Sequence, residues 1–434
     1  MTAGHGQGIV GRIYRNLALL LGGKAAAGLI SLVYLAIAAR ILGPADFGRL
    51  ALISGYTLVI GGIVNFPGWH AVVRYGASAV AAGDAPRLFR LMRFTAKIEL
   101  SAGACAVLIA ALAAPLLGPH LGLDRDIMRY VAPYSLAVLA TVRTTPTGLL
   151  QLLGRFRLLS LHSIINPLVR LAGTILVAIG GFGLPGFLIA WLLAALAECL
   201  SMWALGWWCL RRTFPDRPAA GAISAARENP GLLRFMLLAN ADATFADLSP
   251  RVALLIVGWV LGPIAAGLYS VGQRATVVIA QPAILLGQAS YSELAHLVTR
   301  GGTAAMLRRA LLRCIGVAML SASPILLLLA LFPRPIVDLL AGNAFAAASG
   351  IMLWLMIARV VRVAAPPLSA ALIAMGRPSL SVTANVVAGL LLLPALPLLM
   401  RFAGLAGAGY FALLEAALAV AILAGFTMRT AGER

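Results

Sequence analysis

The chain alternates long runs of apolar residues with short polar segments, and this pattern predicts membrane-spanning helices. A helix needs roughly 20 apolar residues to cross a bilayer, since each residue adds about 1.5 Å along its axis. Twelve stretches reach that length, at about residues 17–39, 49–69, 98–118, 128–150, 158–180, 184–210, 232–260, 264–290, 310–332, 350–372, 379–400 and 404–427. The polar segments between them are too short for a second domain. We therefore expect an all-α integral membrane protein with twelve transmembrane helices.

A short motif occurs twice, and each copy ends one apolar stretch and opens the next. The copies, about half the chain apart, read Leu42-Gly43-Pro44-Ala45-Asp46-Phe47-Gly48 and Leu261-Gly262-Pro263-Ile264-Ala265-Ala266-Gly267. Transporters built from two similar halves bind their substrates between the halves. Six crossings per half would send both halves into the membrane in the same direction. The motif therefore predicts two six-helix bundles related by a parallel internal repeat.

The repeat also sets the expected domain boundaries. Residues 1–210 form the N-terminal six-helix bundle and residues 232–434 form the C-terminal one. Between them, residues 211–231 are rich in arginine and proline, which is typical of a linker. We expect this basic linker to lie in the cytoplasm.

The composition agrees with a membrane protein and explains the charge. Hydrophobic residues make up 61% of the chain and charged residues only 11%, against about 25% charged in soluble domains. The net charge of +20 could indicate nucleic acid binding, but most lysines and arginines fall in the segments expected inside the cell. This bias follows the positive-inside rule, and it places both termini in the cytoplasm. We expect a multi-pass protein of the bacterial inner membrane, with lipids and no nucleic acid as partners.

Charged residues inside the apolar stretches are the candidate functional residues, because an ionisable group at membrane depth is costly and marks a binding path. The basic ones outnumber the acidic ones. They are Lys24, Arg143, Arg170, Arg251, Arg274, Arg359 and Arg362, against Glu198, Asp242, Asp247 and Glu415.

Five of these cations are predicted to line a central cavity that binds an anion. They are Lys24, Arg170, Arg274, Arg359 and Arg362. Arg359 and Arg362 are three residues apart and so share one face of a helix. Guanidinium groups bind phosphate through two parallel hydrogen bonds, so this set favours a phosphate-bearing substrate. Internal salt bridging is the alternative for each of them.

Asp242 and Asp247 have two interpretations. A carboxylate in a membrane cavity can bind H⁺ or Na⁺, so the pair is a candidate site for a coupling ion, with Asn240 and Thr244 as further oxygen ligands. Alternatively, they form a polar patch that closes the bundle, in which Asp247 pairs with Arg251 one helical turn later.

The sequence does not favour an enzyme. The histidines are scattered without the spacing of metal ligands, and no nucleophile elbow or phosphate-binding loop is present. The four cysteines fall in or beside apolar stretches without paired spacing. We expect no catalytic residues, no metal site and no cofactor.

The sequence resembles polysaccharide flippases of the Wzx type, within the multidrug/oligosaccharidyl-lipid/polysaccharide exporter superfamily. The N-terminal resemblance lies in Gly23-Lys24-Ala25, in Ala39-Arg40-Ile41-Leu42-Gly43-Pro44-Ala45-Asp46-Phe47-Gly48, and in Arg74-Tyr75. The second half of that family is similar to Val260-Leu261-Gly262-Pro263 and to Gly267-Leu268-Tyr269-Ser270-Val271.

The resemblance implies a transporter that flips polyprenyl-pyrophosphate-linked oligosaccharide units from the cytoplasmic to the periplasmic leaflet by alternating access. Its implied partners are the lipid-linked oligosaccharide and the polysaccharide polymerase and chain-length proteins. Lys24 and the arginines of the spans would hold the pyrophosphate. Cation-coupled multidrug antiporters of the same superfamily are the alternative. Their cation sites use carboxylates in the N-terminal half, whereas the first span here offers a lysine.

Overall fold

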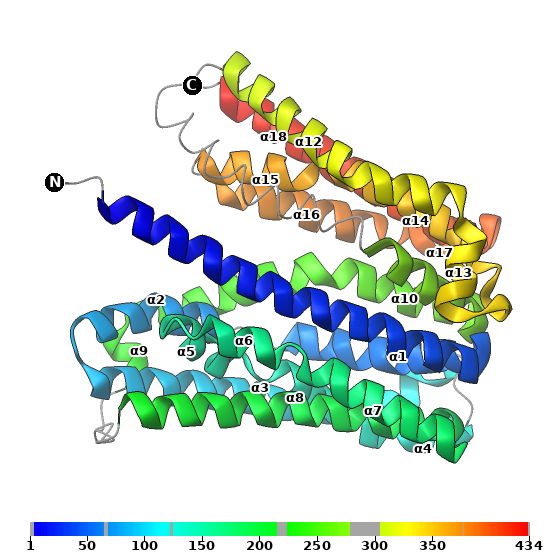
Figure 1. The fold of residues 1–434 in the computed structure, drawn as a ribbon, viewed down its shortest axis with the longest axis horizontal. Coiled ribbons are helices and arrows are strands. Elements are labelled where there is room, and N and C mark those ends of the chain that lie inside the picture. The colour runs from blue at the N-terminus through cyan, green and yellow to red at the C-terminus, as the bar shows by residue number, and fades with distance from the viewer. Residues whose placement is uncertain are drawn as a thin grey trace. The chain divides into compact units, whose positions relative to one another are not determined.

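The computed structural model describes residues 4–64, 68–121, 125–214, 224–277, 304–375 and 377–432, and their regular structure is entirely helical (Figure 1). The α-helices are α1 (Gly4–Val64), α2 (Gly68–Ala81), α3 (Ala85–Leu117), α4 (Arg125–Tyr134), α5 (Thr144–Leu152), α6 (Phe156–His162), α7 (Ile165–Gly180), α8 (Gly183–Thr213), α9 (Ala225–Glu228), α10 (Leu232–Thr276), α12 (Ala304–Leu331), α13 (Pro333–Ala341), α14 (Ala348–Arg362), α15 (Ala365–Ala374), α16 (Pro378–Leu392), α17 (Ala395–Ala403) and α18 (Leu405–Gly432). Three short 3₁₀-helices are η1 (Pro119–Leu121), η2 (Ser135–Thr141) and η4 (Asn343–Phe345).

Eight helical stretches among the described residues are long and apolar enough to cross a membrane. A ninth arises if α16 and α17, which are bent by 50° at their junction, form one span. One of the eight, Gly22–Ala81, is 60 residues long. A straight helix of that many residues would be about 90 Å long, some three times the thickness of a hydrocarbon core. The chain is therefore an all-helical, multi-pass membrane protein, and this long stretch has room for more than one crossing.

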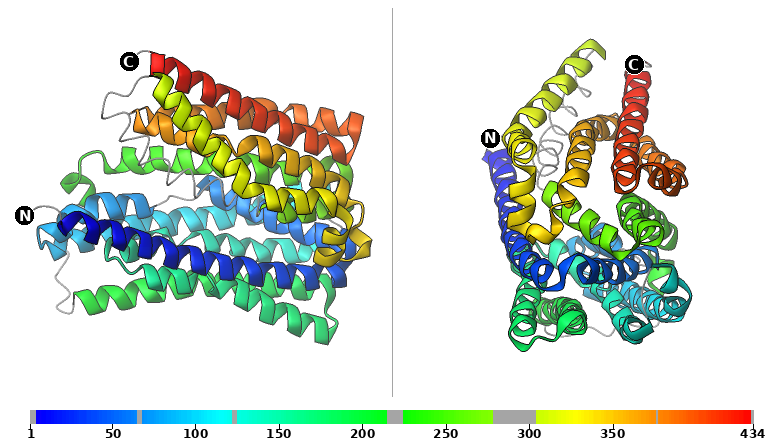
Figure 2. Two further views of the ribbon diagram at one scale, coloured as in Figure 1. Left: turned by 45° about the horizontal axis from the view of Figure 1, so that its top comes forward. Right: turned by 90° about the vertical axis from the view of Figure 1, so that its right-hand side faces the viewer.

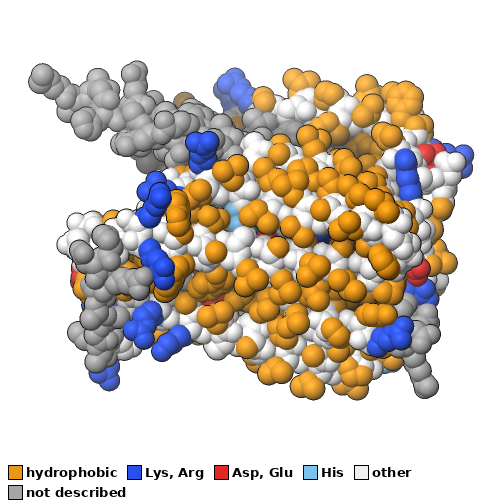
Figure 3. Space-filling model, turned by 60° about the horizontal axis from the view of Figure 1, so that its bottom comes forward, with side chains coloured by type: hydrophobic (Ala, Val, Ile, Leu, Met, Phe, Trp, Pro, Cys, Tyr) orange, Lys and Arg blue, Asp and Glu red, His pale blue; other side chains and the backbone are white. Residues whose placement is uncertain are grey.

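The outer surface carries the apolar belt of a membrane protein. Figure 3 shows hydrophobic side chains over the middle of one face, with lysines and arginines gathered toward the ends of the helices. On α3, Leu108, Leu112 and Leu116 are 62%, 73% and 72% exposed. Their spacing of four residues places them on one side of the helix. An exposed leucine stripe of this kind faces lipid.

Contacts divide the chain into two compact units. Unit 1 comprises Met1–Ile41 and Tyr56–Thr244, and unit 2 comprises Leu42–Gly55 and Phe245–Arg434. In unit 1, α7 packs on α8, and α2 packs on α3 and α5; in unit 2, α18 packs against α14, α16 and α17 (Figures 1 and 2). Each unit thus takes a segment from the other half of the sequence. The boundaries at residues 210 and 232 follow the sequence repeat instead, and they stay a prediction.

The two copies of the repeated motif have the same backbone shape. Gly43 (φ 68°, ψ 177°) interrupts α1, and Gly262 (φ 84°, ψ 177°) interrupts α10 at the corresponding position. Positive φ is a conformation that favours glycine, and the proline that follows each glycine has no N–H to continue the helix. The Gly-Pro pair therefore breaks both helices at the same step of the motif.

The two turns also pack against each other, within unit 2. A methyl group added to Gly48 would overlap the carbonyl oxygen of Pro263, and one added to Gly267 would overlap the carbonyl oxygen of Pro44. The contact is reciprocal, which is the signature of an approximate two-fold axis. Phe47, beside this contact, packs edge-on against Phe345 with ring centroids 5.6 Å apart.

Candidate functional site

The fourth predicted span, at residues 128–150, is not one continuous helix. It consists of α4, η2 and α5, and the backbone of Val142 and Arg143 between η2 and α5 is not helical (φ −86°, ψ 72° and φ −154°, ψ 12°). Irregular backbone at membrane depth is tolerated only where protein or a water-filled cavity surrounds it, and broken helices mark the binding regions of many transporters. We therefore build the candidate site of unit 1 around this break.

Buried side chains satisfy the polar backbone groups at the break. The first N–H groups of a helix lack helical partners and carry its positive dipole end. At α5, the Glu99 carboxylate accepts hydrogen bonds from the backbone N–H of Thr144 and from that of Thr145, the second at 2.8 Å. On the other side, the Val142 carbonyl accepts a 2.8 Å bond from the Trp203 indole. The end of α5 is thus closed by the protein itself and is not an open anion site.

Sequence reasoning missed Glu99. The residue falls at the edge of a predicted span, where a carboxylate resembles an interfacial residue, yet it is 1% exposed. One signal could have found it. Arg143 stands at the N-cap position of α5 and makes no capping bond, so a helix beginning there in the membrane requires an acceptor from elsewhere.

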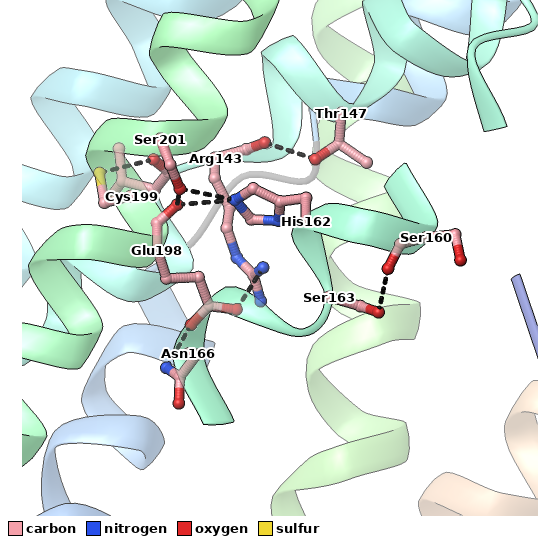
Figure 4. Close-up of polar contacts among 10 residues, drawn as sticks. Arg143, Thr147, Ser160, His162, Ser163, Asn166, Glu198, Cys199 and Ser201 are labelled. Carbon is pink, nitrogen blue, oxygen red and sulfur yellow. Dashed lines mark hydrogen bonds and ion pairs between the residues drawn. The ribbon is translucent and has the colours of Figure 1, made fainter. Parts of the chain in front are cut away.

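Arg143 and Glu198 form the centre of a polar network in unit 1 (Figure 4). Arg143 Nη1 lies 2.5 Å from Glu198 Oε1, and Asn166 Nδ2 donates to Glu198 Oε2 at 2.6 Å. His162 Nε2 lies 3.0 Å from the Glu198 backbone oxygen and 3.1 Å from Ser201 Oγ. Both carboxylate oxygens of Glu198 are therefore engaged, and the charge of Arg143 is compensated.

Arg170, one of the predicted cavity residues, lies beside two aromatic rings that contact each other. Its guanidinium carbon is 5.1 Å from the Trp191 ring centroid and 5.8 Å from that of Tyr34, and Nη1 donates to the Tyr34 hydroxyl at 3.3 Å. Its Nε is buried without a hydrogen-bond partner among the described residues. Cation–π contacts hold such a group without neutralising it. No carboxylate pairs with Arg170 in the described part of the chain.

Arg359 and Arg362 lie together in unit 2, as their spacing predicts. Arg362 Nη1 is 3.4 Å from Glu415 Oε1 on α18, and Arg359 lies within electrostatic range of both Arg362 and Glu415. A methyl group added to Gly389 would come within 3.7 Å of both Glu415 Oε1 and Ser249 Oγ. Ser249 Oγ is buried with no partner among the described residues. Glu415 thus pairs with Arg362 near an unsatisfied hydroxyl, and Arg359 forms no ion pair with a carboxylate among the described residues.

Lys24 and Arg274 are exposed on their helices. Gly23 is the residue of α1 that packs against Ser160, so Lys24 beside it faces away from that contact. Tyr34, which holds Arg170, lies about 15 Å further along α1 at 1.5 Å per residue. Tyr34 and Lys24 thus lie almost three helical turns apart on α1.

The predicted convergence of the five cations on one cavity involves residues of both units. Arg359 and Arg362 are neighbours, whereas Lys24 and Arg170 belong to unit 1, and each unit is described by itself. Their common cavity stays a prediction. The side chains of Asp242 and Asp247 lie outside the described residues, so the coupling-ion interpretation and the pairing with Arg251 also stay predictions. Among the described residues, no group of three or more histidine, cysteine, aspartate or glutamate side chains could hold a metal ion.

Known proteins share both the sequence pattern and the fold. The profile of the polysaccharide biosynthesis protein family matches residues 37–350. The inner membrane protein YghQ of Escherichia coli (strain K12) is 27% identical over 293 residues, which cover 66% of this chain and 81% of YghQ.

Solved transporters have a similar arrangement of helices. An inward-facing multidrug resistance MATE family transporter of the MOP superfamily superposes with a TM-score of 0.75 at 16% identity, covering 94% of this chain and 95% of that one. A MOP superfamily transporter from Pyrococcus furiosus Vc1 (DSM3638) gives a TM-score of 0.57 at 15% identity, covering 96% and 94%. The helical arrangement is therefore similar to that of these solved structures, and the family profile spans most of the sequence. The chain belongs to the polysaccharide biosynthesis protein family, and its fold is similar to that of these solved transporters.

Proposed function

We propose that this protein flips polyprenyl-pyrophosphate-linked oligosaccharide units from the cytoplasmic to the periplasmic leaflet of the bacterial inner membrane. The association with polysaccharide biosynthesis comes from the family to which the chain belongs. The proposed binding of pyrophosphate comes from the basic residues within the apolar stretches. In this proposal twelve spans form two six-helix bundles related by a parallel repeat. The matching backbone of Gly43 and Gly262 and the reciprocal contact of their turns support that repeat.

The observation that carries the proposal is the Arg362–Glu415 pair, beside which Arg359 has no carboxylate partner of its own among the described residues. With Arg362 paired to that carboxylate, the charge of Arg359 is left over among the described residues. A buried net charge is costly unless it is paired. A pyrophosphate entering the cavity would supply the missing negative charge, and Arg170 in unit 1 carries a second uncompensated guanidinium of the same kind.

The proposed mechanism is alternating access. The cavity opens to the cytoplasm, the cationic side chains bind the pyrophosphate, and the sugars occupy the wet interior. The polyprenyl tail stays in the lipid between the bundles, which then rock to open outward. Asp242 and Asp247 remain the candidate ligands of a coupling ion. Polysaccharide polymerase and chain-length proteins would receive the product.

Arg359→Gln is the sharpest test, because it removes the surplus charge and leaves the Arg362–Glu415 pair in place. We expect proteoliposomes containing the variant to flip a fluorescent polyprenyl-pyrophosphate oligosaccharide about tenfold or more slowly than the parent. This corresponds to the roughly 1.5–3 kcal/mol of one charge-assisted hydrogen bond. Arg401→Gln, on an exposed arginine of α17, is the matched control for the change in charge. If Arg359→Gln flips the substrate at the parental rate, Arg359 does not bind the pyrophosphate.

The antiporter alternative makes a different prediction. It requires ion-gradient-driven expulsion of organic cations such as ethidium, which need a free carboxylate in the cavity. In the described spans, Glu99, Glu198 and Glu415 are each engaged by internal donors. The transporter from Pyrococcus furiosus is described as having a binding pocket of reverse polarity that suggests a different function. We expect proteoliposomes of the present protein to leave ethidium untransported.

A further inference from the structure

A basic cavity lies in unit 1, at the end of α8 that leads into the linker and away from the intramembrane charges. It has a volume of about 320 Å³ and is lined by Gly154, Arg155, Arg157, Leu158, Trp208 and Arg212, with Cys209 at its base. The volume is at the lower end of the range for small-molecule sites. It suits a headgroup rather than a whole lipid.

A tight turn places two of the arginines. The last turn of α5 ends with Gly154 at φ +67°, where the Gly154 N–H bonds to the Gln151 carbonyl and the Arg155 N–H bonds to the Leu150 carbonyl. These two bonds form a Schellman motif, which requires a left-handed residue and stops the helix at a fixed place. Arg155 and Arg157 follow directly and present their side chains at the cavity.

The C-terminal end of α8 supplies the other wall. The Arg212 guanidinium carbon lies 4.4 Å from the Trp208 ring centroid, and Arg211 lies 4.6 Å from that of Trp207. Stacking of this kind fixes the guanidinium plane and leaves its N–H groups free to bind an anion. Arg155 and Arg157 on one side and Arg212 on the other line the same cavity, so the two walls face each other.

The charge of the cavity is not compensated. None of its three arginines forms an ion pair with a carboxylate among the described residues, and no acidic side chain lines it. Three positive charges around one small cavity match a phosphodiester, which guanidinium groups bind bidentately.

The surroundings indicate which phosphate compound binds. Trp207 and Trp208 are 56% and 43% exposed at the end of a span, where tryptophan marks the level of the lipid headgroups. Leu193 and Leu200, 55% and 67% exposed, lie fourteen and seven residues before Trp207 and so share its face of α8. An acyl chain can lie along this stripe while its headgroup occupies the cavity.

We propose that this cavity binds the headgroup of an anionic glycerophospholipid of the cytoplasmic leaflet. Basic pockets between transmembrane helices on the cytoplasmic side are suited to such lipids. The site is separate from the one proposed for transport. It ties the α5–α6 turn to the end of α8 through a lipid of the surrounding membrane.

Native mass spectrometry of the detergent-purified protein tests this site. The variant combines Arg155→Gln, Arg157→Gln and Arg212→Gln, and the matched control combines Arg308→Gln, Arg309→Gln and Arg313→Gln on α12. Both lose three positive charges. With cardiolipin or phosphatidylglycerol added, we expect the cavity variant to retain at least fivefold less lipid than the parent, and the control to retain the parental amount. Phosphatidylcholine should bind weakly to all three proteins.

Several outcomes would overturn the proposal. Equal losses in the two triple variants would show that net charge alone attracts lipid. Binding of inorganic phosphate with the affinity of the lipid would show that the cavity binds a free anion. Displacement of the phospholipid by equimolar polyprenyl pyrophosphate would assign the cavity to the cargo. A Trp208→Phe variant, which keeps all three arginines, should lose part of the lipid retention; full retention would contradict the role of the stacked pair.

Discussion

At the scale of single residues, the protein pairs some intramembrane charges and leaves others uncompensated. Arg143 and Arg362 each lie beside a carboxylate, while Arg170 is held by aromatic rings. The paired charges have a structural role, because a buried ion is tolerated when its partner and hydrogen bonds are in place. Uncompensated ones are the candidates for binding an anion.

Glu198→Ala tests the structural role of the first pair. The variant leaves Arg143 without its carboxylate and Asn166 without its acceptor, so we expect a loss of about 2 kcal/mol in stability. This is less than the 3–5 kcal/mol of a fully buried pair, because Arg143 is 35% exposed. Thermal unfolding in detergent measures it. Asp46→Ala, which breaks the partly exposed Asp46–Arg49 pair three residues apart on one helix, is the control and should cost less than about 1 kcal/mol.

Two further observations would complete that test. Replacing both partners, as Arg143→Met with Glu198→Leu, should restore most of the stability, since well-packed apolar residues can substitute for a buried pair. Flipping activity in the double variant should remain within about threefold of the parent. A stable double variant that cannot transport would instead give Glu198 a part in the transport cycle.

Sequence reasoning at this scale identified which residues were unusual but not their partners. The spacing of Arg359 and Arg362 was sufficient to predict that they share a helix face. Nothing along the chain indicated that Glu198 reaches Arg143, because 55 residues and a broken helix separate them. Glu99 was missed because its role depends on the irregular backbone at Arg143, which a count of apolar residues cannot detect.

At the scale of elements, the two Gly-Pro turns are the points at which α1 and α10 are interrupted. Their sequence predicted a repeated turn, and the structure gives both copies one backbone conformation. The close approach of Gly48 and Gly267 is a consequence that the motif did not reveal. Only residues without a side chain allow the two backbones to come so near each other.

Gly48→Ala should destabilise the protein strongly, because the added methyl group would overlap the Pro263 carbonyl oxygen. We expect a loss of at least about 2 kcal/mol, in the range of overpacking against rigid backbone. Thermal unfolding and membrane expression level measure the effect. Gly28→Ala is the matched control, since a methyl group there meets nothing within 4 Å. It should be neutral or slightly stabilising, as in any helix. Equal effects of the two variants would argue against a tight contact of the turns.

The short helix α9 is a second element that the sequence did not predict. Glu228 accepts two hydrogen bonds from Arg90, at 2.8 Å from Nε and 2.6 Å from Nη2, and Asn229 Oδ1 accepts one from Arg87. These bonds fix the start of the second half of the sequence to α3. The segment was expected to be linker because its composition is basic and rich in proline, and composition carries no information about a remote partner.

Glu228→Arg should release α9 from α3, because two guanidinium groups would then face each other. We expect trypsin to cleave after Arg227 several-fold faster than in the parent, as followed by limited proteolysis of membranes. Exchanging both residues, as Arg90→Glu with Glu228→Arg, should restore the parental rate, since the ion pair reforms with reversed polarity. A rate unaffected by either change would mean that α9 is held by its apolar contacts alone.

At the scale of the whole molecule, the arrangement of unit 1 agrees with the topology expected from its charges. The sequence placed the α2–α3 turn, the α5–α6 turn and the linker on one side of the membrane. In the structure, the Arg90–Glu228 pair joins the first of these to the linker, and the basic cavity joins the second to the end of α8. Segments far apart along the chain thus meet at one end of the unit.

The distribution of basic residues along the sequence predicts the orientation of the protein, with both termini in the cytoplasm. Green fluorescent protein folds only on the cytoplasmic side when export is through the general secretory route, whereas alkaline phosphatase is active only in the periplasm. We expect fusions after Phe214 and after Arg434 to fluoresce, and a fusion after Leu121, at the opposite end of α3, to have phosphatase activity.

A fluorescent Leu121 fusion would reverse the orientation and place the basic cavity in the outer leaflet. The Arg434 fusions could be inactive in both assays while the Phe214 fusion fluoresces. Fusions at further positions of the second half would then count its crossings. Phosphatase activity at Arg434 would make that number odd and contradict the parallel repeat.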